Sequence, residues 1–266
     1  MIEPSDMRRL RLTIAYDGRP WLGWQSQPGG QTVQDKLSAA LTTIARVPLG
    51  VEGSGRTDSG VHALAQVAHC DVPAHLRMDC HNWVRALNAN LPASIRVTDC
   101  EFATPDFHAR FHAQGKIYRY RIWRADVMSP FEVGRAWHVY GDLDVAALER
   151  CARQLVGTHN FVRLSANRGD ISEEARRSDP EVTTRTIHRV AVSEQDDVLT
   201  FEIEGSGFLY KMVRMITGSL VHMARGRDTE AWFEDLLHNP AGEKSSQCAL
   251  PDGLYLVRVK YGSRGV

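Results

Sequence analysis

The sequence predicts an α+β protein of two lobes, each with an antiparallel sheet and helices on one face. The first observation is an order of strand, helix, strand, helix, strand that occurs twice along the 266 residues, with a joint near residue 113. The second is composition, because 43% hydrophobic residues can bury the core of one large domain or two ordinary ones. We therefore divide the chain into an N-terminal lobe, residues 1–113, and a C-terminal lobe, residues 114–266.

The N-terminal lobe begins with a strand in which Leu10, Leu12 and Ile14 alternate with polar residues. The first predicted helix follows over residues 32–47, with Thr32 as its N-cap. Its apolar face consists of Val33, Leu37, Leu41 and Ile44. A strand over 61–72, a helix over 78–91 and a strand over 95–103 complete this lobe.

The C-terminal lobe repeats the pattern, starting with a strand over 116–125 whose tyrosines share one face. Asp144 caps the next helix, and Gly157 ends it. The remaining predicted elements are a strand over 198–205, helices over 210–226 and 229–239, and a closing strand over 254–261. Residues 165–179 are rich in charged and polar side chains, which predicts a long surface loop.

The composition restricts the partners and the compartment. Basic and acidic residues cancel at 32 each, so any site for a polyanion must be a local patch. Five cysteines without a CxxC pair indicate a reduced, cytosolic protein. The sequence has no leader-like or long apolar segment, so we expect a cytoplasmic protein that does not bind membranes. In such a protein the Arg-Gly-Asp triplet at 168–170 resembles an integrin signal only by coincidence.

The stretch GSGRTDSGVHA, residues 53–63, carries the clearest sign of chemistry. A phosphate-binding loop would need Lys-Ser/Thr after its second glycine or a third glycine in place of Asp58, and a carboxylate would repel phosphate. An aspartate in a turn often only caps its own backbone. Here three glycines clear the flanks and leave Arg56 and Asp58 as the projecting groups. This pattern makes Asp58 a candidate catalytic carboxylate.

Basic and aromatic residues alternate between residues 110 and 121. Arg110 and Lys116 are interleaved with Phe111 and Tyr118, a pattern typical of RNA recognition, since aromatic rings stack on bases and cations bind phosphates. A strand that buries its tyrosines in a core would show the same alternation. We predict that Arg110 and Lys116 bind substrate, while the role of each tyrosine stays open.

His108 and His112 are four residues apart, which is the spacing of two imidazole ligands on a zinc-binding helix. The glutamate that would follow the first histidine in such a motif is missing. The sequence indicates no third ligand either. We therefore predict no metal site.

Arg214 stands in the middle of an apolar predicted helix. An arginine in such surroundings is rarely fully buried without a partner. Either its guanidinium reaches the surface or it pairs with a carboxylate, for which Asp58 is a candidate. The residues alone leave both possibilities open.

Five stretches together resemble one enzyme family over nearly the whole chain: GSGRTDSGVHALAQVAH, WLGWQSQPGGQTVQDKLSAAL, KIYRYRI, GFLYKMVRMITGSL and ALPDGLYLVRVKY. Their order and the RTD-GVHA block resemble the tRNA pseudouridine synthase A family. The resemblance implies two RRM-like (ferredoxin-like) lobes with antiparallel sheets meeting at a central catalytic cleft. It also implies a homodimer, without cofactor or metal, that isomerises uridine to pseudouridine in the tRNA anticodon stem-loop, at positions 38–40.

The resemblance further implies roles for single residues. Asp58 corresponds to the catalytic aspartate of the family, and Arg214 to the arginine that pairs with it. Tyr118 corresponds to the tyrosine that stacks against the target base, and Arg56 to the arginine that helps to displace this base. Leu254 corresponds to an apolar residue that lines the pocket. Whether the carboxylate attacks C1′ as a nucleophile or takes a proton from C2′ as a base stays open.

Two other functions fit part of the sequence. A noncatalytic RNA-binding protein would explain the basic and aromatic residues but not the glycine-flanked Asp58. A glycoside-cleaving enzyme would need a second carboxylate in a comparable setting, which the sequence does not offer. Residues 159–170 and their charged continuation depart from the pattern of the family, which leaves the range of substrates open.

Overall fold

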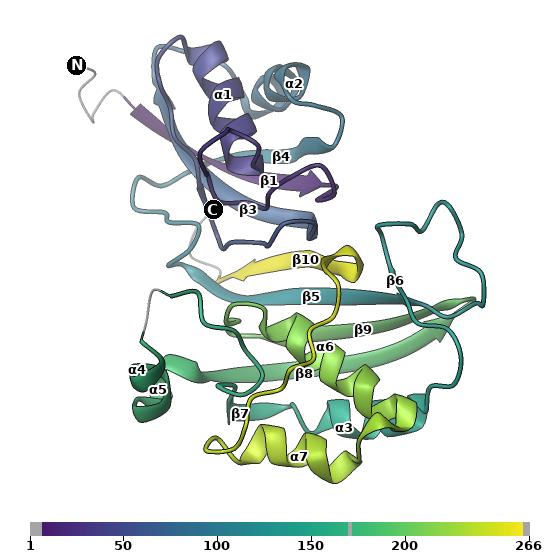
Figure 1. Cartoon of the computed structure of the whole chain (residues 1–266). Helices are drawn as coiled ribbons and strands as arrows, with labels where there is room; N and C mark the ends of the chain where they lie inside the picture. The colour runs from purple at the N-terminus through teal and green to yellow at the C-terminus, as the bar shows by residue number, and fades with distance from the viewer. Residues whose placement is uncertain (1–6, 170–171, 263–266) are drawn as a thin grey trace. The chain divides into compact units, whose positions relative to one another are not determined.

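The computed structural model describes residues 7–169 and 172–262 of the chain. By their contacts the residues form two compact units, Met1–Gln114 with Tyr255–Val266, and Gly115–Leu254, which we call unit 1 and unit 2. Both combine helices with mostly antiparallel strands (Figure 1), which confirms the α+β class. The end of the chain is grouped with its beginning, in unit 1.

Unit 1 is a sheet with two helices on one face. Its strand order is β4 (Ile95–Ala103), β1 (Met7–Tyr16), β3 (His62–Pro73) and β10 (Leu254–Tyr261), with the short β2 (Glu52–Gly53) beside β3. β1 is antiparallel to both neighbours, with Leu12 opposite Ala68 and Cys100, whereas β10 is parallel to β3. Figure 1 shows α1 (Val33–Ala45) and α2 (Cys80–Asn90) on the same face of β1, β3 and β4.

The core of unit 1 lies between this sheet and its helices. The apolar residues that alternate along β1 and repeat along α1 meet there and are fully buried: Leu10, Leu12, Ile14, Val33, Leu37 and Leu41. Ile44, predicted on the same face of α1, is only half-buried. The predicted N-cap is confirmed, because the Thr32 hydroxyl accepts the backbone N–H of Asp35, whose carboxylate accepts the backbone N–H of Thr32.

Unit 2 contains the remaining elements. Its antiparallel strands follow the order β5 (Ala113–Trp123), β9 (Val198–Gly205), β8 (Thr184–Gln195) and β7 (Gly157–Asn160), and β6 (Trp137–His138) is parallel to β5. The longer helices are α3 (Val145–Arg153), α6 (Met212–His222), which continues into η2 (Met223–Arg227), and α7 (Glu230–His238). The short ones are α4 (Glu173–Ser178), α5 (Pro180–Thr183) and η3 (Pro251–Gly253). Within the described residues, no helix is long and apolar enough to span a membrane.

Several elements of unit 2 differ from the sequence-based expectation. The predicted loop 165–179 contains α4, whose first turn is capped by the Ser172 hydroxyl. Ser165 is fully buried and accepts a hydrogen bond from Arg176 of that helix (2.9 Å). The loop prediction is therefore wrong for residues 173–178, whereas residues 165–169 form no helix or strand. Residues 170–171, including the Asp of the Arg-Gly-Asp triplet, lie outside the described residues. The strands β6, β7 and β8 and the helix α5 also have no counterpart in the sequence-based prediction.

Candidate active site

Asp58 stands on the connection between β2 and β3 of unit 1, and two glycines shape this connection. A Cβ on Gly53 would lie 2.5 Å from the ring of Trp24, and Gly60 has a φ of +82° that favours glycine. The backbone N–H of Trp24 also donates to the carbonyl oxygen of Thr57 (3.1 Å). The close approach that the glycines suggested is thus made by a tryptophan of the protein itself.

Buried hydrogen bonds fix the backbone that leads into Asp58. Directly before it the Thr57 hydroxyl lies 2.8 Å from the hydroxyl of Tyr16, and burial raises the pKa of this phenol to about 12, so that it stays neutral. Four residues before Asp58, Ser54 Oγ donates to Oε1 of Gln66 (2.7 Å), whose amide nitrogen donates to the carbonyl oxygen of Gly55 (2.9 Å). The half-buried Asp58 is therefore presented by anchored backbone, as a reacting carboxylate requires.

Arg56 is exposed two residues before Asp58 and is oriented by two glutamines. Its Nε donates to Oε1 of Gln25 (2.9 Å), and Nε2 of Gln25 donates to Oε1 of Gln34 on α1 (2.9 Å). Gln34 in turn donates to the carbonyl oxygen of Val51 (2.8 Å). This chain of amides holds the guanidinium beside the connection that carries Asp58.

Unit 2 contains four of the predicted site residues: Lys116, Tyr118, Arg214 and Leu254. Tyr118 is 8% exposed on β5, and its ring meets the ring of Phe208 edge to face, with centroids 5.0 Å apart. Lys116 is half-buried two residues earlier, on the same face of the strand. The side of β5 that was predicted to bind RNA therefore combines a cation with a supported aromatic ring.

Arg214 lies half-buried on α6 and is tied to the segment before β10. Its Nε donates to the carbonyl oxygen of Ala249 (2.8 Å), and the N–H of Ala249 donates back to the carbonyl of Arg214 (3.0 Å). The next carbonyl, of Leu250, accepts the hydroxyl of Tyr120 (2.6 Å). Burial raises the pKa of Tyr120 well above its usual value, and the charge of Arg214 partly opposes this. The buried Leu254 begins β10 four residues later. Residues 249–254 therefore link the acceptors of Arg214 and Tyr120 to the start of β10.

His108 and His112 do not share a helix face, because residues 104–112 form turns between β4 and β5. Nδ1 of His112 instead accepts the backbone N–H of His108 (3.4 Å). Beside His108 lie Glu52 and His69, and the three potential ligand atoms are within 4.8 Å of one another. No spacing in the sequence indicates either neighbour, because both depend on the pairing of β2 with β3, which places Glu52 opposite His69.

Hydrogen bonds show what this cluster can do. Nδ1 of His69 accepts the N–H of Ala109 (3.3 Å), and Nδ1 of His108 accepts the N–H of Arg110 (3.1 Å). A ring nitrogen that accepts a hydrogen bond carries no proton, so the proton of each neutral ring sits on Nε2. For His108 this Nε2–H faces Oε2 of Glu52 at 3.2 Å. A metal ion on the Nε2 atoms would require these backbone contacts to break, and the arrangement is better described as a hydrogen-bonded cluster.

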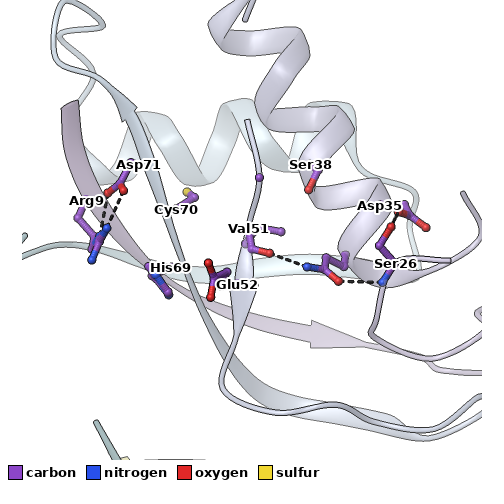
Figure 2. A pocket seen from close by; sticks show the side chains of 11 residues that line it. Arg9, Ser26, Asp35, Ser38, Val51, Glu52, His69, Cys70 and Asp71 are labelled. Atoms are coloured by element: carbon purple, nitrogen blue, oxygen red, sulfur yellow. Dashed lines mark hydrogen bonds and ion pairs between the residues drawn. The ribbon is translucent and has the colours of Figure 1, made fainter. Parts of the chain in front are cut away.

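A cavity of about 470 Å³ opens beside this cluster in unit 1 (Figure 2). Figure 2 shows Arg9 paired with Asp71. The shortest distance between the guanidinium and the carboxylate is 2.6 Å. The carboxylates of Asp35, Glu52 and Asp71 outnumber this arginine, so the cavity is unsuited to a phosphate group. None of the predicted site residues lines it: its walls are Arg9, Ser26, Gln34, Asp35, Ser38, Gly50, Val51, Glu52, His69, Cys70 and Asp71.

Known proteins resemble this chain over nearly its full length. A family model described as tRNA pseudouridine synthase matches residues 12–112 and 151–262. A tRNA pseudouridine synthase A of Akkermansia muciniphila is 46% identical over 256 residues, 96% of each chain. The tRNA pseudouridine synthase A of Solidesulfovibrio magneticus is 43% identical over 98% of this chain and 93% of its own length. The tRNA pseudouridine synthase A of Bacillus licheniformis is 40% identical over 95% of this chain and 99% of its own length.

Proposed function

Because the chain belongs to the tRNA pseudouridine synthase family, we propose that it isomerises uridine to pseudouridine in the tRNA anticodon stem-loop, at positions 38–40, with Asp58 as the reacting carboxylate. The anchoring of the backbone around Asp58 supports this role most directly. Ser54 and Thr57, both in the segment that leads into Asp58, are fixed by buried hydrogen bonds. An aspartate that only capped a turn would not require two such anchors.

The reaction breaks the C1′–N1 bond of a uridine and forms a bond from C1′ to C5 of the same base. N1 gains a proton and C5 loses its hydrogen to water, so atoms and electrons balance within one nucleotide. The target base must first leave its stack, at a cost of a few kcal/mol. The carboxylate of Asp58 then opens the glycosidic bond, either by attack on C1′ or by removal of a proton from C2′.

The other site residues act on the same uridine in this proposal. Arg56, oriented by Gln25, occupies the space that the extruded base leaves. Tyr118 stacks on the uracil ring, and Leu254 lines its pocket. Arg214 keeps the carboxylate of Asp58 ionised, since a neighbouring cation favours the charged form. Unit 1 is then the RRM-like lobe with the aspartate, and unit 2 the RRM-like lobe with the tyrosine and the arginine.

Arg110 and Lys116 serve in this proposal to hold the backbone of the tRNA, because lysine and arginine are the side chains that neutralise phosphates. The proposed enzyme is a cytoplasmic homodimer. An apolar stretch between β5 and α3 supports the dimer, because Val127, Phe131 and Val133 are 80%, 82% and 54% exposed. Apolar patches of this kind are common at protein–protein contacts.

Release of tritium tests the chemistry. Unmodified tRNA transcribed with tritium at C5 of uracil is incubated with the wild type and with Asp58→Ala and Asp58→Asn. The wild type should release tritium to water, whereas both variants should release none. Asp197→Asn is a matched control, because it removes an exposed carboxylate from the turn between β8 and β9 and should leave the rate unchanged. Binding of tRNA without any release by the wild type would favour the noncatalytic RNA-binding protein instead.

A further inference from the structure

Phe111, in the turns between β4 and β5, is 73% exposed although the backbone around it is firmly held. Phe107 and Ala109 are almost completely buried. The hydroxyl of Tyr261 donates to the carbonyl oxygen of Ala109 (2.6 Å), and Arg9 donates to that of Phe107 (2.8 Å). An exposed aromatic ring is therefore presented from fixed backbone, which limits the entropy that a ligand must remove on binding.

His108 supports one side of the Phe111 ring. The two ring centroids are 4.2 Å apart, with an angle of 33° between the planes. The imidazole is itself held at both nitrogens, because Nδ1 accepts the N–H groups of Arg110 (3.1 Å) and Phe111 (3.4 Å) and Nε2 faces Glu52 (3.2 Å). The cluster of histidine and glutamate thus has a structural task, which is to fix this pair of rings.

The charge around the ring suits an RNA base. The guanidinium carbon of Arg110 lies 5.7 Å from the centroid of Phe111, and the neighbouring His112 is exposed. Glu52, 67% exposed, is the acidic side chain at His108 and is already engaged by it. An aromatic face beside an arginine is the combination with which proteins hold unpaired bases and their phosphates.

We propose that Phe111, backed by His108 and flanked by Arg110, is a stacking platform for an unpaired base of the RNA substrate. Paired bases within a helix do not offer a free face, so the occupant is a nucleotide of a loop or a single-stranded end. The inference deepens the proposed function and rests on it for the class of substrate.

The platform is remote from the reacting uridine. His69, which accepts a hydrogen bond from Ala109, is seven residues further along β3 than His62, close to the connection that carries Asp58. At 3.3 Å per residue this is a distance of about 23 Å. The platform therefore contributes to the binding of RNA and not to the chemical step.

The test compares Phe111→Ala, Phe111→Leu and Phe111→Trp with the wild type. The equilibrium dissociation constant for unmodified tRNA is measured at one fixed salt concentration, and tritium release is measured in single turnover at saturating enzyme. Loss of a stacked base should weaken binding on the order of 5- to 100-fold for the alanine and leucine variants. The tryptophan variant should bind like the wild type, and all saturated rates should be unchanged. Val156→Ala is the control, because it trims a half-exposed apolar side chain of unit 2. It should alter neither the dissociation constant nor the saturated rate.

Three results would overturn the platform: unchanged binding by Phe111→Ala, wild-type binding by Phe111→Leu, or a changed sedimentation coefficient of RNA-free Phe111→Ala. The second would indicate simple apolar contact, and the third a contact between protein chains. Failure of the proposed function is distinguishable, because the wild type would then release no tritium whatever the dissociation constants. Weakened binding of tRNA by the first two variants would still support the platform in that case.

Discussion

Replacing Gly23 by alanine is expected to displace the connection that carries Asp58. Gly23 has a φ of +86°, and a Cβ there would lie 2.5 Å from the carbonyl oxygen of Thr57 and 3.0 Å from the carbonyl carbon of Asp58. These are backbone atoms, which cannot turn aside as the end of a side chain can. Since unstrained contacts are about 3.5 Å or longer, the two segments must separate by roughly 1 Å.

A shift of this size at a reacting group costs about 100-fold in rate, which corresponds to about 2.7 kcal/mol. Alanine in the left-handed region adds a separate cost of about 1–2 kcal/mol to the free energy of folding. The left-handed strain lowers stability only, whereas the displacement lowers stability and also slows the reaction at Asp58. The two effects therefore require two measurements: urea-induced unfolding and single-turnover release of tritium from C5-labelled tRNA.

Gly29→Ala is the control that separates these effects. Gly29 also has a left-handed φ, of +102°, but a Cβ there would have nothing within 4 Å. Both variants should lose stability, Gly23→Ala more than Gly29→Ala because only its Cβ clashes, and only Gly23→Ala should be slow in releasing tritium. Equal rates for the two folded variants would refute the reasoning, because the clash with Thr57 and Asp58 would then have no effect on the reaction.

Three further predictions concern stability. Tyr16→Phe leaves the buried Thr57 hydroxyl without its partner and should lower the free energy of unfolding by about 1 kcal/mol in urea. Hydrogen bonds from Arg19 hold the pKa of Asp17 at about 2, below its unfolded value, so the stability that Asp17 adds is complete above about pH 4 and is lost toward pH 2. Between these pH values the unfolding free energy of Asp17→Asn should fall less than that of the wild type. Arg163→Leu removes the hydrogen bonds of a buried guanidinium to the carbonyl oxygens of Asp235, Asn239 and Glu243, and should cost at least about 2 kcal/mol, measured by thermal unfolding.

Sequence patterns predict those elements that bury one face and expose the other. β1 and α1 are of this kind. The sequence shows an apolar period of two residues along β1 and of 3.6 residues along α1. β8 is not, because Ile187 is its one buried residue and most others are half-exposed on both faces. α4 has no apolar stripe either, although Ser172 before two glutamates is a usable signal for a helix start.

The candidate site likewise has some features that the local sequence indicates and others that depend on contacts between distant segments. The glycines around Asp58 correctly indicate a close approach, but that Trp24 makes it depends on a fold that brings residues 24 and 53 together. The neighbours of His108 depend on the register of a two-residue strand, β2, against β3. Such contacts join segments far apart in the chain, and no local spacing encodes them. The roles of Asp58, Tyr118 and Arg214 remain predictions that the proposed variants test.

The neutral net charge of the chain does not argue against an RNA substrate, because the charge is unevenly distributed. Unit 1 has 14 basic and 11 acidic residues, whereas unit 2 has 18 basic and 21 acidic residues. Within unit 2 the ion pairs Arg119–Glu202 (3.1 Å) and Arg121–Glu132 (2.8 Å) compensate two cations of the predicted basic stretch. Attraction of phosphate should therefore be strongest on unit 1, which carries the proposed carboxylate Asp58, Arg56 and the proposed Phe111 platform.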